Sequence, residues 1–187
     1  MHWVFIGKFT PLWFVLLVLL NLTVSFYWFQ VVGAQNSFIN VLLFLVNGVA
    51  LLAWELFRRA GVNWLTSRWT PRLIMLYIFI LLVVPTIAFI YGSDNIANFD
   101  PWLRVLAGMF VVVSVVTLYV YSQRVLDQFM LIVCSFSLII TLVALVLKTG
   151  NFGTGVIFLA GALVIGLAAL VVVWLRRLSE KGEVQQT

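Results

Sequence analysis

The chain has 187 residues, of which 64% are apolar, 16% aromatic and only 9% charged, with a formal net charge of +5 and a mean hydropathy of +1.17. A soluble globular domain carries about 25% charged and about 45–50% apolar residues, because water must solvate its surface. This composition excludes an ordinary soluble domain. Six apolar runs occupy most of the chain and leave only short connections, so the sequence predicts a single membrane domain over residues 1–187 with no soluble domain.

We expect all six apolar runs to be transmembrane helices. Each run is long enough to cross roughly 30 Å of hydrocarbon at a rise of about 1.5 Å per residue. Hydrocarbon offers the backbone no hydrogen-bond partners, and the runs lack the alternation of a barrel strand. The predicted fold class is therefore an all-α bundle of six transmembrane helices. The predicted spans are about 11–32, 38–57, 73–91, 102–122, 128–147 and 156–175.

Prolines mark the starts of three of these spans. Each follows an oxygen-bearing residue that can cap a helix, and proline itself suits the first helical position. The fourth proline, Pro85, falls inside the third span, where it removes one backbone hydrogen bond and is expected to kink the helix. The three capped starts are Thr10-Pro11, Thr70-Pro71 and Asp100-Pro101.

The distribution of basic residues predicts the orientation. With the N-terminus in the cytoplasm, nine Lys and Arg residues lie on the cytoplasmic side, and only Arg104 and Lys148 lie outside. The positive-inside rule therefore favours cytoplasmic N- and C-termini, and we expect the inner (plasma) membrane of a bacterium. The cytoplasmic set is Lys8, Arg58, Arg59, Arg68, Arg72, Arg124, Arg176, Arg177 and Lys181.

The scarcity of chemically active side chains excludes several functions. The chain has one histidine, His2, and one cysteine, Cys134, too few for bis-histidine haem, catalytic zinc, disulfide exchange or a Ser/His protease. Glu55 lies near the end of the second span, with Arg58 and Arg59 three and four residues later, and this spacing predicts an ion pair on the helix surface. We expect no catalytic residues, no metal ligands and no cofactor.

The isoelectric point of about 9.8 does not indicate nucleic-acid binding. The positive charge comes from the margins of a membrane protein, where basic residues set orientation and attract anionic lipid. We expect contact with anionic lipid at the cytoplasmic face, and no nucleic-acid partner.

Polar side chains at mid-depth form the most interesting group in the sequence. Polar side chains avoid hydrocarbon, so they are expected to face protein or a cavity. In one interpretation, Asn21 and Asn47 pin the first two helices together while the hydroxyls bond to their own backbone. In the other, the group lines a pocket for a small neutral or zwitterionic solute. These candidate ligand-binding residues are Asn21, Ser25, Asn47, Ser114 and Ser137.

Two further segments are candidates for contact with lipid or a partner. The second cytoplasmic connection, 58–72, mixes arginine with tryptophan, and Val62, Leu65 and Trp69 recur at helical spacing, which suggests a short interfacial helix. In the sixth span, Ala162 and Gly166 have the spacing that lets two helices approach closely, within the bundle or with a partner. The candidate lipid or partner contacts of the connection are Arg58, Arg59, Trp64, Arg68, Trp69 and Arg72.

Three functions remain compatible with this pattern. The leading hypothesis is a non-enzymatic protein that acts as a subunit or an assembly or regulatory partner of a membrane complex, with another membrane protein or a second copy of itself as partner. The alternative is a component that transports or captures a small solute at mid-membrane. A third is a sensory input module, because the helix that ends near Trp174 could continue into a signalling domain.

Overall fold

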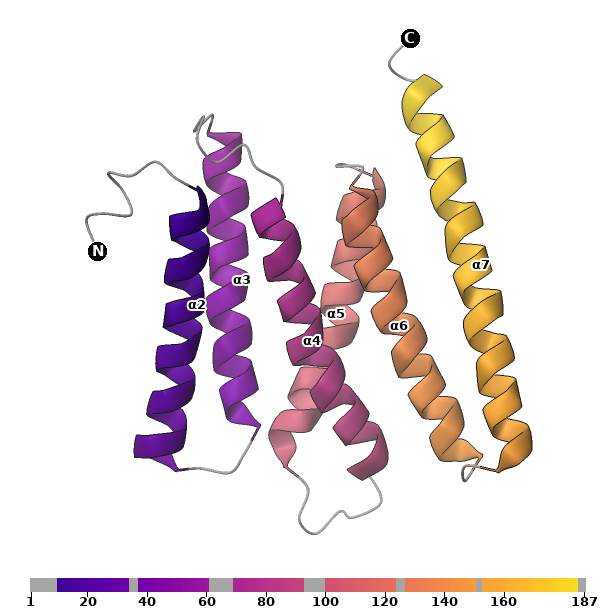
Figure 1. Ribbon diagram of the computed structural model, residues 1–187, viewed down its shortest axis with the longest axis horizontal. Coiled ribbons are helices and arrows are strands. Elements are labelled where there is room, and N and C mark those ends of the chain that lie inside the picture. The colour runs from indigo at the N-terminus through magenta and orange to yellow at the C-terminus, as the bar shows by residue number, and fades with distance from the viewer. Residues whose placement is uncertain are drawn as a thin grey trace. The chain divides into compact units, whose positions relative to one another are not determined.

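The structure is a computed structural model that describes residues 10–33, 37–60, 69–92, 100–123, 127–150 and 153–184. These residues form helices, without a strand in the described ranges (Figure 1). The elements in chain order are α2 (Thr10–Tyr27), the π-helix η1 (Trp28–Val32), α3 (Phe38–Arg59), α4 (Trp69–Gly92), α5 (Pro101–Gln123), α6 (Gln128–Thr149) and α7 (Thr154–Val184).

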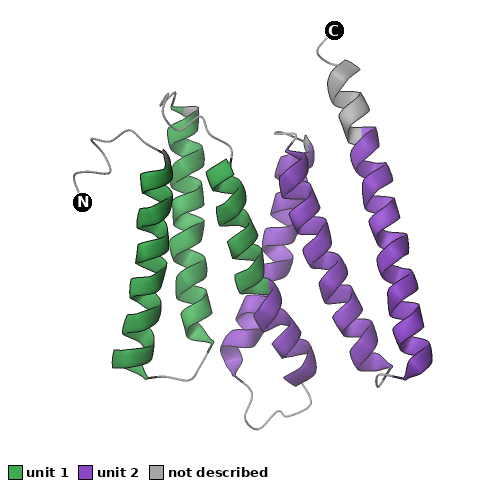
Figure 2. Cartoon of the chain, viewed as in Figure 1, with its two compact units in different colours: residues 1–82 green, residues 83–187 purple. Residues whose placement is uncertain are grey.

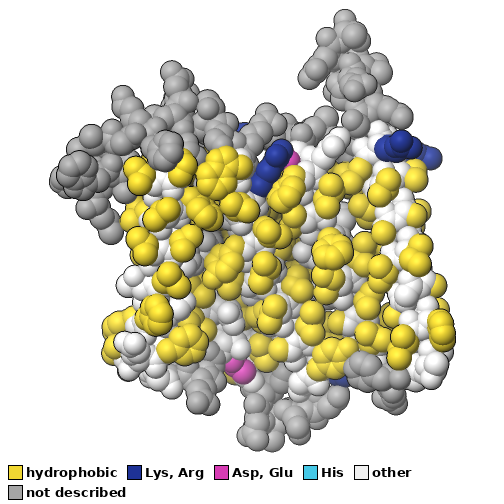
Figure 3. Space-filling view, viewed as in Figure 1, with side chains coloured by type: hydrophobic (Ala, Val, Ile, Leu, Met, Phe, Trp, Pro, Cys, Tyr) yellow, Lys and Arg dark blue, Asp and Glu magenta, His cyan; other side chains and the backbone are white. Residues whose placement is uncertain are grey.

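Six helices in the described part of the chain are long and apolar enough to cross a membrane, which confirms the prediction of six such helices. On the face shown in Figure 3, apolar side chains cover the middle of the helices, and the coloured charges lie near helix ends. The segments that meet these criteria are Pro11–Val32, Phe38–Arg58, Trp69–Gly92, Pro101–Ser122, Gln128–Thr149 and Thr154–Arg177.

The chain divides into two compact units, Met1–Leu82 and Val83–Thr187. Figure 2 shows that the boundary falls inside α4, close to Pro85. Unit 1 therefore contains α2, η1, α3 and the first part of α4, and unit 2 contains the rest of α4 with α5, α6 and α7.

Unit 1 has its apolar core where α2 passes into η1. Buried Trp28 packs with Ile39, Leu43 and Leu81, and its ring lies 5.5 Å from that of Phe38. η1 ends at Gly33, whose φ of 60° is left-handed and whose N–H donates to the Trp28 carbonyl at 2.9 Å. Glycine adopts this conformation at little cost, so the chain can leave the membrane here.

Unit 2 is held together by contacts between α5 and α6 and between α6 and α7. At the C-terminal end of α4, Tyr91 Oη donates to the Ala144 carbonyl at 3.1 Å, and Lys148 Nζ donates to the Ile90 carbonyl. A cation at a helix C-terminus is favourable, because the last carbonyls carry partial negative charge. These two bonds join α4 to α6 near their shared end.

The predicted helix starts are correct at one position and wrong at another. Asp100 precedes α5, and its Oδ1 accepts from the Trp102 N–H at 3.0 Å, which is the geometry of an N-cap. Thr70 is not a cap, because α4 begins at Trp69 and the buried Thr70 Oγ1 has no hydrogen-bond partner among the described residues. Proline fits throughout the first turn of a helix, so Pro71 did not fix the starting residue.

Candidate functional site

A reciprocal pair of amides joins α2 to α3 in the middle of the membrane span. Asn47 Nδ2 donates to Asn21 Oδ1 at 2.6 Å, and Asn21 Nδ2 donates to Asn47 Oδ1 at 3.3 Å. Each amide also donates to the carbonyl four residues earlier on its own helix, at Leu17 and Leu43 respectively. The amide groups are therefore satisfied within the protein, as expected for buried polar groups.

Two of the predicted hydroxyls, one in each unit, bond to their own helices. Ser25 Oγ donates to the Asn21 carbonyl at 2.9 Å, and in unit 2 Ser137 Oγ donates to the Val133 carbonyl at 2.8 Å. These bonds and the amide pair match the interpretation that the asparagines pin two helices while the hydroxyls bond locally. Ser114 is an exception, because its buried Oγ has no hydrogen-bond partner among the described residues.

A half-open groove of about 410 Å³ lies beside the amide pair in unit 1, and we call it the α2–α4 groove. Helix α2 contributes Phe14, Leu17, Val18, Asn21, Leu22 and Ser25. Helix α4 contributes Leu73, Ile74, Leu76, Tyr77 and Ile80, and α3 contributes Asn47. The volume lies within the range of about 300–1,000 Å³ that is typical of sites for small molecules.

The groove brings together only part of the predicted polar group. Asn21, Ser25 and Asn47 line it, while Ser114 and Ser137 belong to unit 2. Within unit 2, Cys134 Sγ contacts the Ser114 carbonyl at 3.6 Å, and the buried Ser114 Oγ lacks a hydrogen-bond partner among the described residues. Both serines are buried, Ser114 on α5 and Ser137 on α6.

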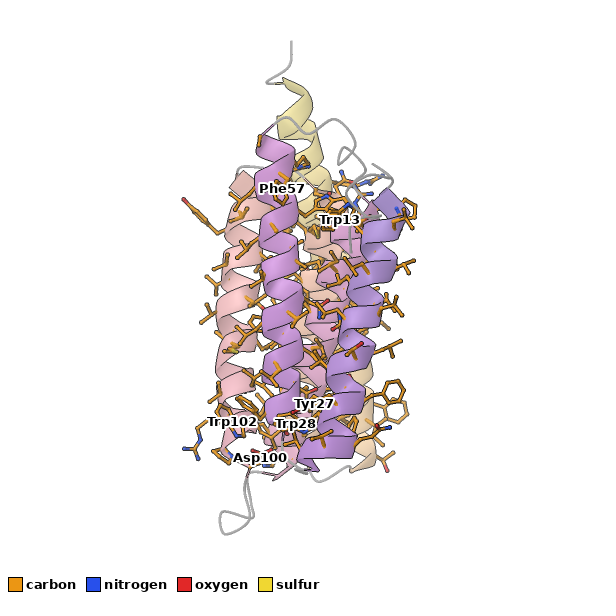
Figure 4. All side chains as sticks on the ribbon, turned by 90° about the vertical axis from the view of Figure 1, so that its left-hand side faces the viewer. Trp13, Tyr27, Trp28, Phe57, Asp100 and Trp102 are labelled. Atoms are coloured by element: carbon orange, nitrogen blue, oxygen red, sulfur yellow. The ribbon has the colours of Figure 1, made fainter. Side chains whose placement is uncertain are left out.

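An aromatic pair lies at one end of the groove, beside the first turn of α4. The Phe14 ring meets the Trp69 ring edge to face, with ring centroids 5.4 Å apart. Arg72 directly precedes Leu73, which lines the groove, and belongs to the first turn of α4. Figure 4 shows Trp13 of α2 and Phe57 of α3 at this end of unit 1, and Tyr27 at the other end.

The predicted ion pair of α3 is present. Arg58 Nη2 lies 2.7 Å from Glu55 Oε2, and both side chains are partly buried. Arg58 and Arg59 belong to α3, and Trp69 and Arg72 belong to α4. The remaining residues of the predicted interfacial helix, including Trp64 and Arg68, lie outside the described residues.

Helix α7 has two different faces. Its residues that are not fully exposed recur at spacings of three and four, which places them on one face, named here the packed stripe. Four exposed small residues lie on the opposite side at spacings of seven, four and three, and form the small-residue face. The packed stripe is Val156, Ala160, Leu163, Leu167, Val171 and Leu175, and the small-residue face is Gly155, Ala162, Gly166 and Ala169.

Sequence reasoning did not identify the α4 wall of the groove. On α2 a signal existed, since Phe14, Val18 and Ser25 share the helical face of Asn21. On α4 the wall residues Leu73, Leu76 and Ile80 lie in a continuous apolar run, in which no polar side chain distinguishes one face from another. Only the groove that α4 shares with α2 reveals this face.

The remaining chemistry of the described residues is limited. No three His, Cys, Asp or Glu side chains within the described ranges lie close enough together to share a metal ion. In comparisons with protein-family models, with curated proteins and with solved structures, no match was found.

Proposed function

We propose that this chain is a non-enzymatic protein of a bacterial inner membrane, with both termini in the cytoplasm, and that it acts as a subunit or assembly partner of a larger membrane complex. The observation that carries the proposal is the open small-residue face of α7. A partner helix would pack against this face, on the opposite side of α7 from the packed stripe.

The energetics of helix association in lipid support this assignment. Hydrocarbon surrounds helices whether or not they associate, so association depends on close backbone approach and van der Waals packing. A Cβ atom built at Gly155 or Gly166 meets nothing within 4 Å, which leaves room for another backbone. Ala162 and Gly166 are exposed, so their predicted role in helix packing is proposed for a helix of another protein or of a second copy.

The solute-capture alternative rests on the α2–α4 groove, which touches both asparagines. It is the weaker candidate, because each amide already bonds to the other and to its own backbone. A polar solute would have to replace those bonds. The sensory alternative remains a prediction from the sequence.

The test is a Gly166→Leu substitution on the small-residue face. The added side chain would hold a partner backbone away, so we expect the partner protein that co-purifies with the wild-type chain in native-membrane nanodiscs to be lost. Native mass spectrometry would give the stoichiometry of the complex in each sample.

Gly161→Leu is the matched control. Gly161 is also exposed, a Cβ atom there meets nothing within 4 Å, and it lies between the packed stripe and the small-residue face. The two substitutions raise helix propensity equally. We expect Gly161→Leu to keep the partner. A wild-type chain that purifies without a protein partner or second copy, or a Gly166→Leu chain that keeps one, would contradict the proposal.

A further inference from the structure

The dimensions of the α2–α4 groove restrict what can occupy it. Along α2 the groove extends from Phe14 to Ser25, which is roughly 16 Å of helix at about 1.5 Å per residue. A volume of about 410 Å³ spread over this length makes the groove long and narrow. This shape suits a single extended chain of atoms.

The walls of the groove indicate that its occupant enters from the bilayer. Val18 and Leu22 on α2, and Leu73, Leu76 and Ile80 on α4, line the groove and are each between 38% and 52% exposed. Because these residues lie within apolar spans, their exposed surface faces hydrocarbon. An occupant that enters from this side comes from the hydrocarbon and not from water. A lipid chain is already in the hydrocarbon, whereas a polar solute is in water.

The polar floor of the groove does not require a polar occupant. The side-chain amides of Asn21 and Asn47 form two hydrogen bonds with each other, with N···O distances of 2.6 and 3.3 Å. The Ser25 hydroxyl donates to the Asn21 carbonyl. An apolar chain laid over these groups breaks none of their hydrogen bonds. Its retention would come from packing contacts along the groove and from its headgroup, because lipid is as apolar as the walls.

The first turn of α4, at one end of the groove, carries a basic residue. Arg72 lies next to the wall residue Leu73, in the first turn of α4, where backbone N–H groups carry partial positive charge. The ring pair of Phe14 and Trp69 lies at the same end, and tryptophan favours the headgroup level of a bilayer. An arginine, a helix start and an interfacial tryptophan together provide a setting for a phosphate.

We infer that the α2–α4 groove binds one acyl chain of an anionic phospholipid, whose phosphate lies against Arg72 at the start of α4. The site goes beyond the proposed partner-binding role, since it lies in unit 1 and the small-residue face lies in unit 2.

The experiment supplies two lipids to the full-length chain. The purified protein, freed of lipid in mild detergent, receives equal amounts of phosphatidylglycerol and phosphatidylcholine, and native mass spectrometry measures which remains bound. We expect one retained lipid per chain, with phosphatidylglycerol preferred. Arg72→Gln is expected to reduce that preference about tenfold, since a hydrogen bond between charged groups is worth about a factor of ten in binding.

Filling the groove tests the acyl-chain site itself. Val18→Trp and Leu76→Trp place a large ring in the groove from opposite walls, and each is expected to abolish retention of the lipid. Val164→Trp is the matched control, because Val164 on α7 is 37% exposed compared with 41% for Val18. A thermal unfolding scan of each variant checks that the fold persists.

A phospholipid with a photoactivatable group at the end of its acyl chain locates the site. We expect cross-links to the groove walls in the wild-type chain and in Val164→Trp, and their loss in both groove variants. Unchanged retention and cross-linking in Val18→Trp and Leu76→Trp would overturn the inference, as would a polar solute or a protein segment found in the groove. Loss of the partner in Gly166→Leu is measured separately, so either proposal can fail alone.

Discussion

The amide pair between Asn21 and Asn47 shows how two side chains can fix the register of helices that are otherwise almost uniformly apolar. Apolar faces pack acceptably in many registers, whereas two amides can bond reciprocally in very few. An amide left without partners in hydrocarbon costs several kcal/mol, and an interhelical hydrogen bond contributes about 0.6–2 kcal/mol. Replacing one asparagine therefore costs more than the lost hydrogen bond contributes, because the other amide is left without its partner.

This asymmetry predicts the behaviour of leucine substitutions. Asn47→Leu leaves Asn21 without its interhelical partner, and we expect the free energy of unfolding to fall by about 1–3 kcal/mol. Asn21→Leu together with Asn47→Leu removes both polar groups and should cost less than the sum of the two single changes. Denaturant titration in mixed micelles, analysed as a double-mutant cycle, measures the difference. Strictly additive losses would show that the amides act independently.

At this scale the sequence was informative wherever a polar residue interrupts an apolar run. Asn21 and Asn47 could be identified as a pair because each lies near the centre of its own span. The spacing also predicted an ion pair of Glu55 with one of the two following arginines, and the structure forms it with Arg58. Tyr77 and Leu76 could not be assigned to a groove, because every face of that helix is apolar. Their role depends on which face meets α2.

Among the elements, the helix starts show most clearly how local chemistry fixes a boundary. Asp127 lies directly before α6, and its Oδ1 accepts from the Phe129 N–H at 3.1 Å. Asp100 makes the equivalent contact at the start of α5. A helix start in an interface has four N–H groups without intrahelical partners, so one carboxylate that satisfies one of them has a measurable effect.

The cap of α6 can be tested alone. Asp127→Ala removes the acceptor, and we expect thermal unfolding to show a loss of about 1 kcal/mol. Asp127→Asn keeps an oxygen in the same position and is expected to change stability by only a few tenths. If the alanine and asparagine variants unfold alike, the charge of Asp127 or another of its contacts is more important than the cap.

The starts of α3 and α6 fall where the predicted spans begin, at 38 and 128, and the cap predicted at Asp100 is present. The start of α4 was predicted less well, since α4 begins at Trp69 although the predicted span begins at 73. The physical reason is that a helix can continue beyond the hydrocarbon, where arginine and threonine are tolerated. Hydropathy locates the apolar part of a helix and is insensitive to its polar first turn.

For the whole molecule, the number of apolar helices could be predicted from composition, and the predicted orientation rests on the placement of basic residues. The chain has nine Lys and Arg residues on one predicted side and two on the other. Both of those predictions depend on sums over many residues, so they tolerate errors at any single position. The division into two units, by contrast, depends on which helices contact each other, and hydropathy contains no information on that.

Orientation can be measured with single cysteines. In a Cys134→Ala background, Ala60→Cys at the end of α3 and Gly153→Cys just before α7 introduce thiols at exposed positions. We expect a membrane-impermeant maleimide to label the second in intact bacterial cells and the first only after lysis, because the two positions lie on opposite sides of the predicted topology. The reverse pattern would place the termini outside the cell.

The amide pair also has a consequence for synthesis. Asn21 and Asn47 are separated by 26 residues, which a ribosome adds in about 1–5 s at roughly 5–20 residues per second. During this interval α2 exists with its asparagine unmatched, so its release into lipid is costly until α3 follows. The insertion machinery should therefore hold the first helix until the second arrives and release the two as a hairpin.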